Sequence, residues 1–198
     1  MSKSDNFMDL GSGIGQIVIQ VAATVGCKSC GIEMIVERHQ HALRLMKAFT
    51  EVLEEAGVEG VDHFVNSVAF INDTISNQDT EIAKCNHIFF NNFGPWFDNS
   101  KGDGTKAVNH IFQESMIPFV ELGTQIITMT ALPEASKRLH VVKFEIAEKS
   151  TTWNRNRLSG FHYTRVKLGW LCKKCSFENE YIAETCGVCN TVPPPIRL

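Results

Sequence analysis

The sequence predicts an α/β fold built on a largely parallel β-sheet, followed by a small cysteine-rich module. Three observations predict this arrangement. Short apolar runs alternate with helical patterns over residues 6 to about 168, which is typical of βαβ units. A glycine-rich loop lies between the first apolar run and the first helical pattern, and four cysteines fall within residues 170–190.

The predicted elements alternate along the first region. We expect strands at residues 7–10, 29–34, 63–68, 88–90, 125–129, 141–146 and 160–168. We expect helices at 14–25, at 42–56, at 73–84 and within 104–122, the second of them from an apolar stripe that recurs every three or four positions. Gly57 ends this second helix, and Asp73 is a candidate cap for the third. The last two strands have no helical pattern between them, so we expect them to pair antiparallel.

The composition excludes several classes of protein. The chain has 198 residues, of which 43% are hydrophobic, including 13 Phe, so it can bury a core and is not intrinsically disordered. A formal net charge of −3 argues against a generally basic nucleic-acid binder. No run of about 18 apolar residues is present, so we expect no membrane-spanning helix. The N-terminus has no secretory signal, and closely spaced cysteines in a reducing compartment favour metal over disulfides.

The glycine loop reads DLGSGIGQ from Asp9 to Gln16. Glycines let the backbone turn sharply and approach a ligand, and the N-terminus of the following helix presents free N–H groups. Asp9 precedes the first glycine by two residues. Glu33 ends the second predicted strand, 18 residues after Gly15, where an acidic side chain can bind ribose hydroxyls. This combination predicts a nucleotide-type cofactor site.

The spacing of the glycines bears on which cofactor binds. A dinucleotide site is typically G-x-G-x-x-G, whereas this loop is G-x-G-x-G. A carboxylate at Asp9 disfavours an anionic pyrophosphate and suits the cationic amino-acid end of S-adenosylmethionine. A nicotinamide site and a glycine turn without a ligand are the alternatives. Five parallel strands and an antiparallel pair are also the seven-stranded plan of Rossmann-like, class I S-adenosylmethionine-dependent methyltransferases.

Several segments together resemble one protein family. They are residues 9–16, 18–23 and 27–28, then 31–33 and 91–93. They resemble the Dot family (disruptor of telomeric silencing), the non-SET methyltransferases that modify a lysine on the globular core of histone H3. The similarity covers about residues 5–168 and is strongest in DLGSGIGQIVIQVAA. The run 89–95, Trp153 and the run 161–166 resemble later parts of the family's domain.

The resemblance implies roles for individual residues. Asp9, Gly11, Gly13, Gly15 and Gln16 would lie against S-adenosylmethionine. Glu33 would bind its ribose, and Phe70 would pack against its adenine. Asn91 would lie near the methionine end and the reacting nitrogen, as the catalytic residue. On the residues alone, Asn91 and Asn92 also suit a turn after a strand, and a phenylalanine such as Phe70 is more often part of a core.

The chain departs from the family pattern at three places. The family has an acidic residue just before its adenine-binding aromatic, and here that position is Ala69. The aromatic wall of the lysine channel falls at Gly160 or Phe161. The family also places a helical region and a cofactor-covering loop upstream of the first strand. The resemblance therefore implies either a truncated gene model or a reduced relative with weak or no activity.

Four cysteines predict a zinc site near the C-terminus. Cys172 and Cys175 form one C-x2-C pair, Cys186 and Cys189 form a second, and ten residues separate the pairs. Four thiolates with this spacing suit tetrahedral Zn2+. The pattern, with Trp170 and Asn179, resembles the Ran-binding-protein class of zinc finger.

Partner binding by this finger follows from the same resemblance. RNA-binding members carry paired arginines after the asparagine, and none is present here. Ubiquitin-binding members carry a Thr-Phe pair and an apolar residue before the last cysteine, which correspond to Ser176, Phe177 and Val188. Ubiquitin is therefore the better expectation, with a purely structural finger as the alternative. Six basic residues between Arg155 and Lys174 form either a solvated face or a stripe that contacts DNA phosphates.

The sequence thus predicts three parts: a methyltransferase domain at residues 1–168, the finger at 169–191 and an extended tail at 192–198. We expect a nuclear enzyme that uses S-adenosylmethionine to methylate a histone H3 lysine in nucleosomes. One alternative is an inactive methyltransferase-like module that is recruited through its finger. Another is a methyltransferase for a different substrate, such as RNA.

Overall fold

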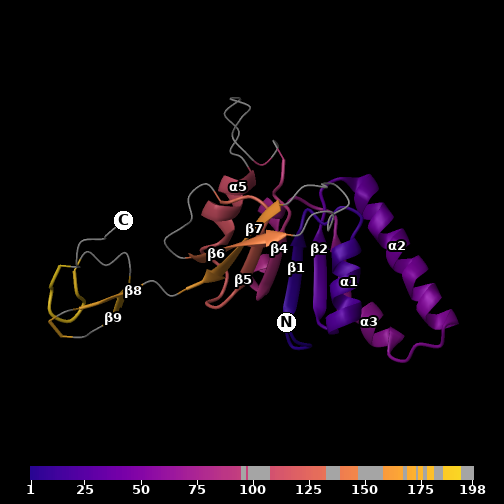
Figure 1. The fold of residues 1–198 in the computed structure, drawn as a ribbon, viewed down its shortest axis with the longest axis horizontal. Coiled ribbons are helices and arrows are strands. Elements are labelled where there is room, and N and C mark those ends of the chain that lie inside the picture. Colours follow the sequence, from indigo (N-terminus) through magenta and orange to yellow (C-terminus); the bar gives the residue numbers. More distant parts are fainter. Residues whose placement is uncertain are drawn as a thin grey trace. The chain divides into compact units, whose positions relative to one another are not determined.

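The computed structural model describes residues 1–94, 97, 108–132, 139–146, 158–166, 169–172, 174–175, 178–180 and 185–192. They belong to two compact units, Met1–Arg165 and Val166–Leu198, each of which is described by itself (Figure 1). The predicted boundary after residue 168 lies just beyond the first unit. Within the described ranges, no helix has both the length and the apolar character needed to cross a bilayer.

The first unit alternates strands and helices. Its elements are β1 (Asn6–Leu10), α1 (Gln16–Val25), β2 (Lys28–Ile32), α2 (Val36–Glu55), α3 (Val61–Ser67), β3 (Val68–Ile71), the 3-10 turn η1 (Ile75–Asn77), α4 (Asp79–Ala83), β4 (His87–Phe90), α5 (Val108–Ile111), the π-helical turn η2 (Phe112–Met116), β5 (Gln125–Thr128), β6 (Leu139–Ile146) and β7 (Leu158–Arg165). In the second unit, β8 (Gly169–Leu171) pairs antiparallel with β9 (Glu178–Glu180).

Seven strands of the first unit form one sheet in the order β3-β2-β1-β4-β5-β7-β6. The first five in this order pair in parallel, whereas β7 runs antiparallel to both β5 and β6. This arrangement confirms the predicted α/β fold with a closing antiparallel pair. The strand order reverses between β1 and β4, and ligands of open α/β sheets bind beyond the carboxyl ends of strands at such a reversal.

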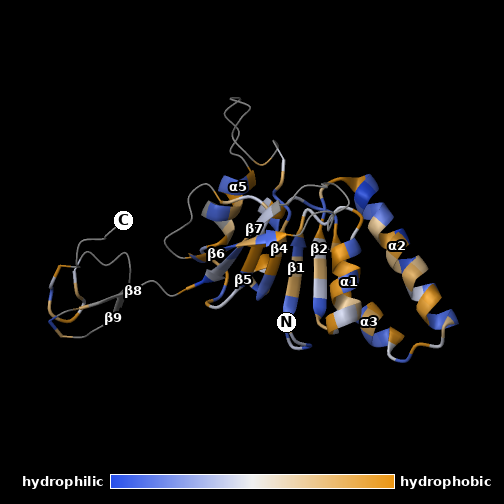
Figure 2. Cartoon of the chain, viewed as in Figure 1, coloured by the Kyte–Doolittle hydropathy of each residue, from blue (hydrophilic) through white to orange (hydrophobic). Residues whose placement is uncertain are grey.

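Two apolar clusters hold the sheet and its helices together. The larger one lies on one face and includes Met8, Leu10, Ile32, Ile88, Phe90, Ile126, Phe112, Met116, Ile117 and Tyr163. The smaller one joins Ile19 and Ala22 of α1 to Phe64 of α3, with apolar residues of α2 against it. In Figure 2, α1 is largely hydrophobic, whereas α2 mixes hydrophobic and hydrophilic residues. Helix α2 therefore covers this cluster with one stripe and faces solvent elsewhere.

The predicted third strand at residues 63–68 is wrong. Residues Val61–Ser67 form α3, and β3 begins only at Val68. The helix follows Gly60, which has a φ of 81°. The ring of Phe64 packs edge-on against Phe49 of α2, with ring centroids 5.5 Å apart. Packing against α2 thus outweighs the strand propensity of this short apolar run.

The segment expected as one helix at residues 73–84 is divided into η1 and α4. The Asp73 carboxylate accepts hydrogen bonds from the Thr74 N–H (2.7 Å), from Asn77 Nδ2 (2.9 Å) and from Gln78 Nε2 (2.7 Å). These bonds close a compact turn at the end of β3. Asp73 therefore organises a turn there instead of capping a continuous helix. The helix expected within 104–122 is described as α5 and η2.

Candidate active site

Three glycines shape the loop between β1 and α1. Gly11, Gly13 and Gly15 have φ values of 75°, 57° and 77°, a backbone conformation that glycine adopts without steric cost. The N–H groups of Gly11 and Ser12 both donate to the carbonyl oxygen of Ile32, at 2.9 Å. The loop is thereby fastened to the carboxyl end of β2, and α1 begins immediately after it.

Gly15 allows close contact between this loop and β3. A Cβ atom at Gly15 would overlap the ring of Phe70 and would lie 3.0 Å from the Cβ of Ala42 in α2. Phe70 therefore packs on the backbone at the start of α1, and it contributes to the smaller apolar cluster. Its ring is accounted for by this packing.

Glu33 follows β2 directly and is fixed by two backbone groups. Its side chain is buried, with the residue 5% exposed. Oε2 accepts a hydrogen bond from the Gly13 N–H at 2.9 Å, and Oε1 accepts one from the Ile35 N–H at 2.8 Å. The carboxylate thus joins the glycine loop to the start of α2. Each oxygen keeps a further lone pair that can accept a hydrogen bond from a ligand.

Asp9 lies beside Glu33 and is buried without compensation. The residue is 3% exposed, and no residue in the described part of the chain donates a hydrogen bond to its carboxyl group. Burial, followed by the negative charge of Glu33, raises the pKa of Asp9 to about 7. A buried carboxylate of this kind is stabilised by a cation. The loop therefore contains a site that favours a positively charged ligand group.

A cavity of about 570 Å3 opens at the carboxyl edge of the sheet. Most of its walls are apolar, with a few polar groups at one side, as is typical of sites for small organic ligands. It is lined by Gly11, Ile32, Glu33, Met34, Ile35, Arg38, Asp73, Thr74, Ile75, Ser76, Phe90, Phe97, Val108 and Ile111.

The cavity brings together only some of the predicted cofactor residues. Gly11 and Glu33 line it, and Gly13 is bonded to Glu33. Gly15 and Gln16 stand at the start of α1 and are not among the lining residues. Phe70 is not among them either, because its ring packs against Gly15. The expectation for Phe70 is thus not matched by its position.

The residues after β3 are the part of the cavity that the sequence analysis missed. Asp73, Thr74, Ile75 and Ser76 line the cavity, and they follow a strand that begins five residues later than expected. Hydrogen bonds from Gln78, from the Thr74 N–H and from Asn77 hold the pKa of the Asp73 carboxyl below its usual value. The useful signal was the position directly beyond a parallel strand, where ligand-binding residues gather.

Asn91 and Asn92 follow β4 and have different surroundings. Oδ1 of Asn91 is buried and has no hydrogen-bond partner. Because Phe90 is paired with Leu10, Asn91 comes directly after the strand end that lies beside the glycine loop. The Asn92 side chain is instead held by groups that follow β5 and by α5. Of the two, Asn91 is the one with a free acceptor.

Two other predicted features of the site fall on β7. Gly160 is covered by the ring of Phe144 from the neighbouring strand. Phe161 packs against the larger cluster and stacks on Tyr163, with ring centroids 6.4 Å apart. Trp153 lies outside the described residues, as do Arg155, Arg157, Lys167 and Lys173 of the basic stretch.

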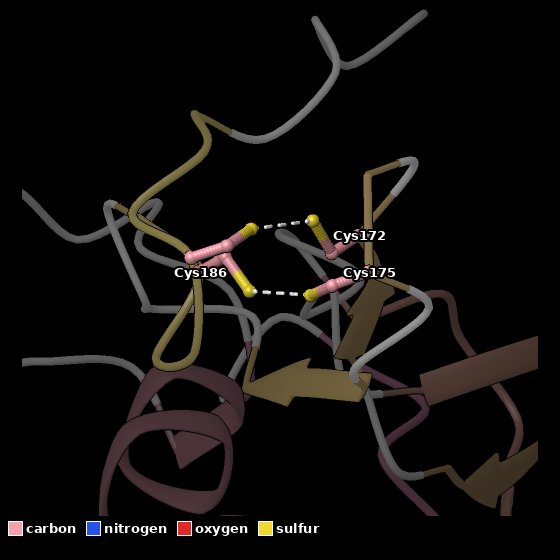
Figure 3. Close-up of side chains that lie close together, drawn as sticks. Cys172, Cys175 and Cys186 are labelled. Carbon is pink, nitrogen blue, oxygen red and sulfur yellow. Dashed lines mark hydrogen bonds between the residues drawn. The ribbon is translucent and has the colours of Figure 1, made fainter.

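The four C-terminal cysteines converge in the second unit. Their Sγ atoms all lie within 4.8 Å of one another, with Cys172 and Cys189 3.4 Å apart and Cys175 and Cys186 3.5 Å apart (Figure 3). All four are free thiols. With Zn–S bonds of about 2.3 Å, the sulfurs of a tetrahedral site lie about 3.8 Å apart. The cluster can therefore hold a metal ion, as the spacing predicted.

Cys27, Cys30 and Cys85 belong to the first unit. Burial raises the pKa of Cys30 to about 11 and that of Cys85 to about 12, which keeps both thiols protonated. The described residues contain no metal-binding group besides the C-terminal four. Among the predicted partner-binding residues, Val188 is 63% exposed, whereas Ser176 and Phe177 lie outside the described residues.

The strand order and the cavity at its carboxyl edge define a class I S-adenosylmethionine-dependent methyltransferase fold. The structure resembles an RNA methyltransferase from Salinibacter ruber solved with S-adenosyl-L-homocysteine (20% identity, TM-score 0.53, 84% of both chains). It also resembles precorrin-6y C5,15-methyltransferase from Geobacter metallireducens (12% identity, TM-score 0.54, 83% of this chain and 82% of that one). Within this class, the chain belongs to the family of histone methylation protein DOT1, whose model matches residues 1–178.

Curated relatives are histone-lysine N-methyltransferases specific for lysine 79 of histone H3. The one from Kluyveromyces lactis is 26% identical over 84% of this chain, and the one from Eremothecium gossypii is 29% identical over 74%. The enzyme from Drosophila melanogaster is 32% identical over 50%. The chain spans 29%, 26% and 5% of the lengths of these three relatives. The resemblance to the Dot family is thereby confirmed.

Asp9→Asn should change how stability depends on pH. The folded-state pKa of Asp9 is raised from 3.8 to about 7, so the native state binds this proton more tightly than the unfolded state. The unfolding free energy of the wild type should therefore fall, relative to Asp9→Asn, as the pH rises from about 4 to 8, by up to about 4 kcal/mol. Urea unfolding at several pH values measures the difference. Asp62→Asn, on an exposed part of α3, should track the wild type; a pH-independent gap for Asp9→Asn would contradict the assignment.

Removing a sulfur ligand should abolish metal binding by the second unit. The purified full-length chain should contain about one equivalent of zinc, and Cys172→Ser or Cys186→Ser should contain much less, because three thiolates leave the tetrahedral site incomplete. Elemental analysis of protein refolded with zinc measures the stoichiometry. Cys30→Ala, outside the cluster, should retain the wild-type amount. Equal zinc content in all four proteins would show that the cluster is not a metal site.

Proposed function

We propose that this chain uses S-adenosylmethionine to methylate a lysine of histone H3 in nucleosomes. The observation that carries the proposal is the pairing of a fixed carboxylate, Glu33, with a buried cation-seeking carboxyl, Asp9, at the edge of a cavity in a DOT1-family chain. Family membership supports the histone substrate. The same activity implies a nuclear location.

The residues around the cavity fit an adenosyl methyl donor. Glu33 would accept hydrogen bonds from the ribose hydroxyls while Gly13 and Ile35 hold it in place. Asp9 would pair with a cationic group of the donor, which supplies an electrophilic methyl group on a sulfonium sulfur. Such pairing stabilises the ionised form of Asp9. Binding would therefore relieve an unfavourable burial that the free protein carries.

The aromatic contact to adenine is assigned to Phe97 in place of Phe70. Phe97 lines the cavity together with Ile75 and Val108. Its ring stands edge-on to Phe90, with centroids 5.5 Å apart and an interplanar angle of 82°, so the strand end supports it. These apolar walls would bury the purine, and the neighbouring Asp73 region supplies the polar groups that the Ala69 position lacks.

Asn91 would act on the incoming lysine. Its buried, unpartnered Oδ1 can accept a hydrogen bond from an amine and orient the nitrogen lone pair. Methyl transfer of this kind depends mainly on alignment, and the lysine proton leaves to water. Arg165 and Lys174, the basic residues of the Arg155–Lys174 stretch that lie in the described part, are candidates for contacts with DNA phosphates.

Cofactor binding and methyl transfer can be tested in one series. Glu33→Gln places an amide N–H₂ where a carboxylate oxygen accepts from the backbone, so it should weaken S-adenosyl-L-homocysteine binding at least tenfold by calorimetry. Glu37→Gln, exposed in the first turn of α2, is the matched control and should bind like the wild type. Tritiated S-adenosylmethionine should label histone H3 in nucleosomes more than free H3.

The outcomes separate the alternatives. Wild-type protein without measurable cofactor binding would sink the enzymatic proposal and leave an inactive, recruited module. Cofactor binding with labelling of RNA and not of nucleosomes would identify a methyltransferase for another substrate. Equal binding by Glu33→Gln and Glu37→Gln would remove Glu33 from the site.

For the second unit, we propose a zinc finger of the Ran-binding-protein class that binds ubiquitin. Val188 supports this proposal, because it is 63% exposed directly beside the ligand Cys189. An exposed apolar side chain on so small a unit is available to an apolar patch of a partner. Phe177 and Ser176 would complete the surface according to the sequence pattern.

Labelled ubiquitin tests this proposal by nuclear magnetic resonance. The zinc-loaded wild-type chain should shift ubiquitin signals, and Val188→Asp should reduce the shifts at least fivefold because a charge would enter an apolar contact. Val192→Asp, at a valine that is 71% exposed but beyond the last ligand, should leave them unchanged. Unshifted ubiquitin signals with wild-type protein would contradict ubiquitin binding.

A further inference from the structure

Asn92 uses its entire hydrogen-bonding capacity inside the protein. The residue is 1% exposed. Its Nδ2 donates to Oδ1 of Asn109 (2.9 Å) and to the carbonyl oxygen of Thr130 (3.0 Å). Its Oδ1 accepts from the N–H groups of Met129 (3.0 Å) and Thr130 (2.7 Å). An amide side chain offers two donors and two acceptor positions, and all four are occupied.

The backbone of Asn92 belongs to the same network. Its N–H donates to the carbonyl oxygen of Phe90 at 2.8 Å, and its carbonyl oxygen accepts from Thr130 Oγ1 at 3.0 Å. Phe90 ends β4, and Thr130 follows the end of β5. Asn92 therefore ties together the carboxyl ends of two neighbouring parallel strands and, through Asn109, helix α5 (Figure 1).

Asn91 stands between two immobilised neighbours. Phe90 is buried in the larger apolar cluster and lines the cavity, and Asn92 is fixed by the six bonds just described. The backbone of Asn91 is thus held from both sides, while its own Oδ1 has no partner. A side chain whose backbone is fixed by a satisfied buried network is well suited to present a free acceptor to a reacting group.

We propose that Asn92 is a positioning residue for methyl transfer, which sets Asn91 by joining the ends of β4 and β5. The proposal rests on the proposed function and deepens it. Asn92 lies outside the cavity lining, so its loss should lower kcat through Asn91 and leave cofactor affinity nearly unchanged. Asn92 does not touch the substrate.

Asn92→Asp tests this role because it preserves half of the network. One carboxylate oxygen still accepts from Met129 and Thr130, whereas the other replaces a donor and faces the Thr130 carbonyl oxygen. Protonation restores a donor, so lowering the pH should repair the network. The groups that contact this side chain, from the end of β5 and from α5, are Met129, Thr130 and Asn109, none of which is ionisable.

The expected result is a kcat defect that depends on pH. At pH 9, kcat on nucleosomes should be at least 20-fold below wild type, and the ratio to wild type should rise at least fivefold by pH 6. The Kd for S-adenosyl-L-homocysteine should stay within threefold of wild type. Asn66→Asp, an exposed asparagine of α3, is the matched control, with a ratio near one throughout. Thr130→Val removes only the bond to the Asn92 carbonyl oxygen and should give a smaller kcat loss in a folded protein.

A second readout is independent of activity. In Asn92→Asp labelled with 15N-asparagine, the side-chain amide signal of Asn91 should shift as the introduced carboxyl group titrates. A stationary Asn91 signal, a pH-independent kcat ratio, or an equal loss of kcat and cofactor affinity would overturn the positioning role. A moving Asn91 signal in a protein whose wild type methylates no histone would uphold the link between Asn92 and Asn91 and refute the proposed function.

Discussion

The hydrogen bonds from the Gly13 and Ile35 N–H groups to the Glu33 carboxylate are the interaction on which the candidate site depends. They join the glycine loop, the end of β2 and the start of α2 at one side chain. The bonds exist only because the loop has a left-handed backbone at three positions and returns to the Ile32 carbonyl oxygen. Charge-assisted bonds of this type are stronger than those between neutral groups, so the carboxylate is fixed before any ligand arrives.

The site combines this satisfied carboxylate with polar groups that the fold leaves unpaired. Asp9 is buried with a raised pKa, and Ser12 Oγ and Asn91 Oδ1 are buried acceptors or donors without partners. All three lie on segments at the carboxyl edge of the sheet. Buried polar groups are normally paired, and such departures gather where a protein binds ligands. The free protein is therefore less stable than a fully paired version of the same fold would be.

The two units reach order by different physical means. The first buries apolar side chains on both sides of a seven-stranded sheet. The second has a two-stranded sheet and four converging thiols, and a segment of this size cannot bury enough apolar surface to fold by packing alone. A bound metal ion would supply that stabilisation, on the order of 10 kcal/mol for structural zinc. Ligand chemistry therefore matters to the second unit as packing does to the first.

The sequence by itself determined the features that local chemistry encodes. Glycines at fixed spacing required the loop, Glu33 followed an apolar run at the expected distance, and two C-x2-C pairs predicted the thiol cluster. Only the tertiary structure decided that residues 61–67 are helical, that Phe70 packs on Gly15 and that Asp73 and Phe97 line the cavity. The physical reason is that periodicity and turn chemistry are properties of neighbouring residues. Which side chain faces a ligand depends instead on where a strand begins, and contacts between distant segments such as Phe64 with Phe49 set that point.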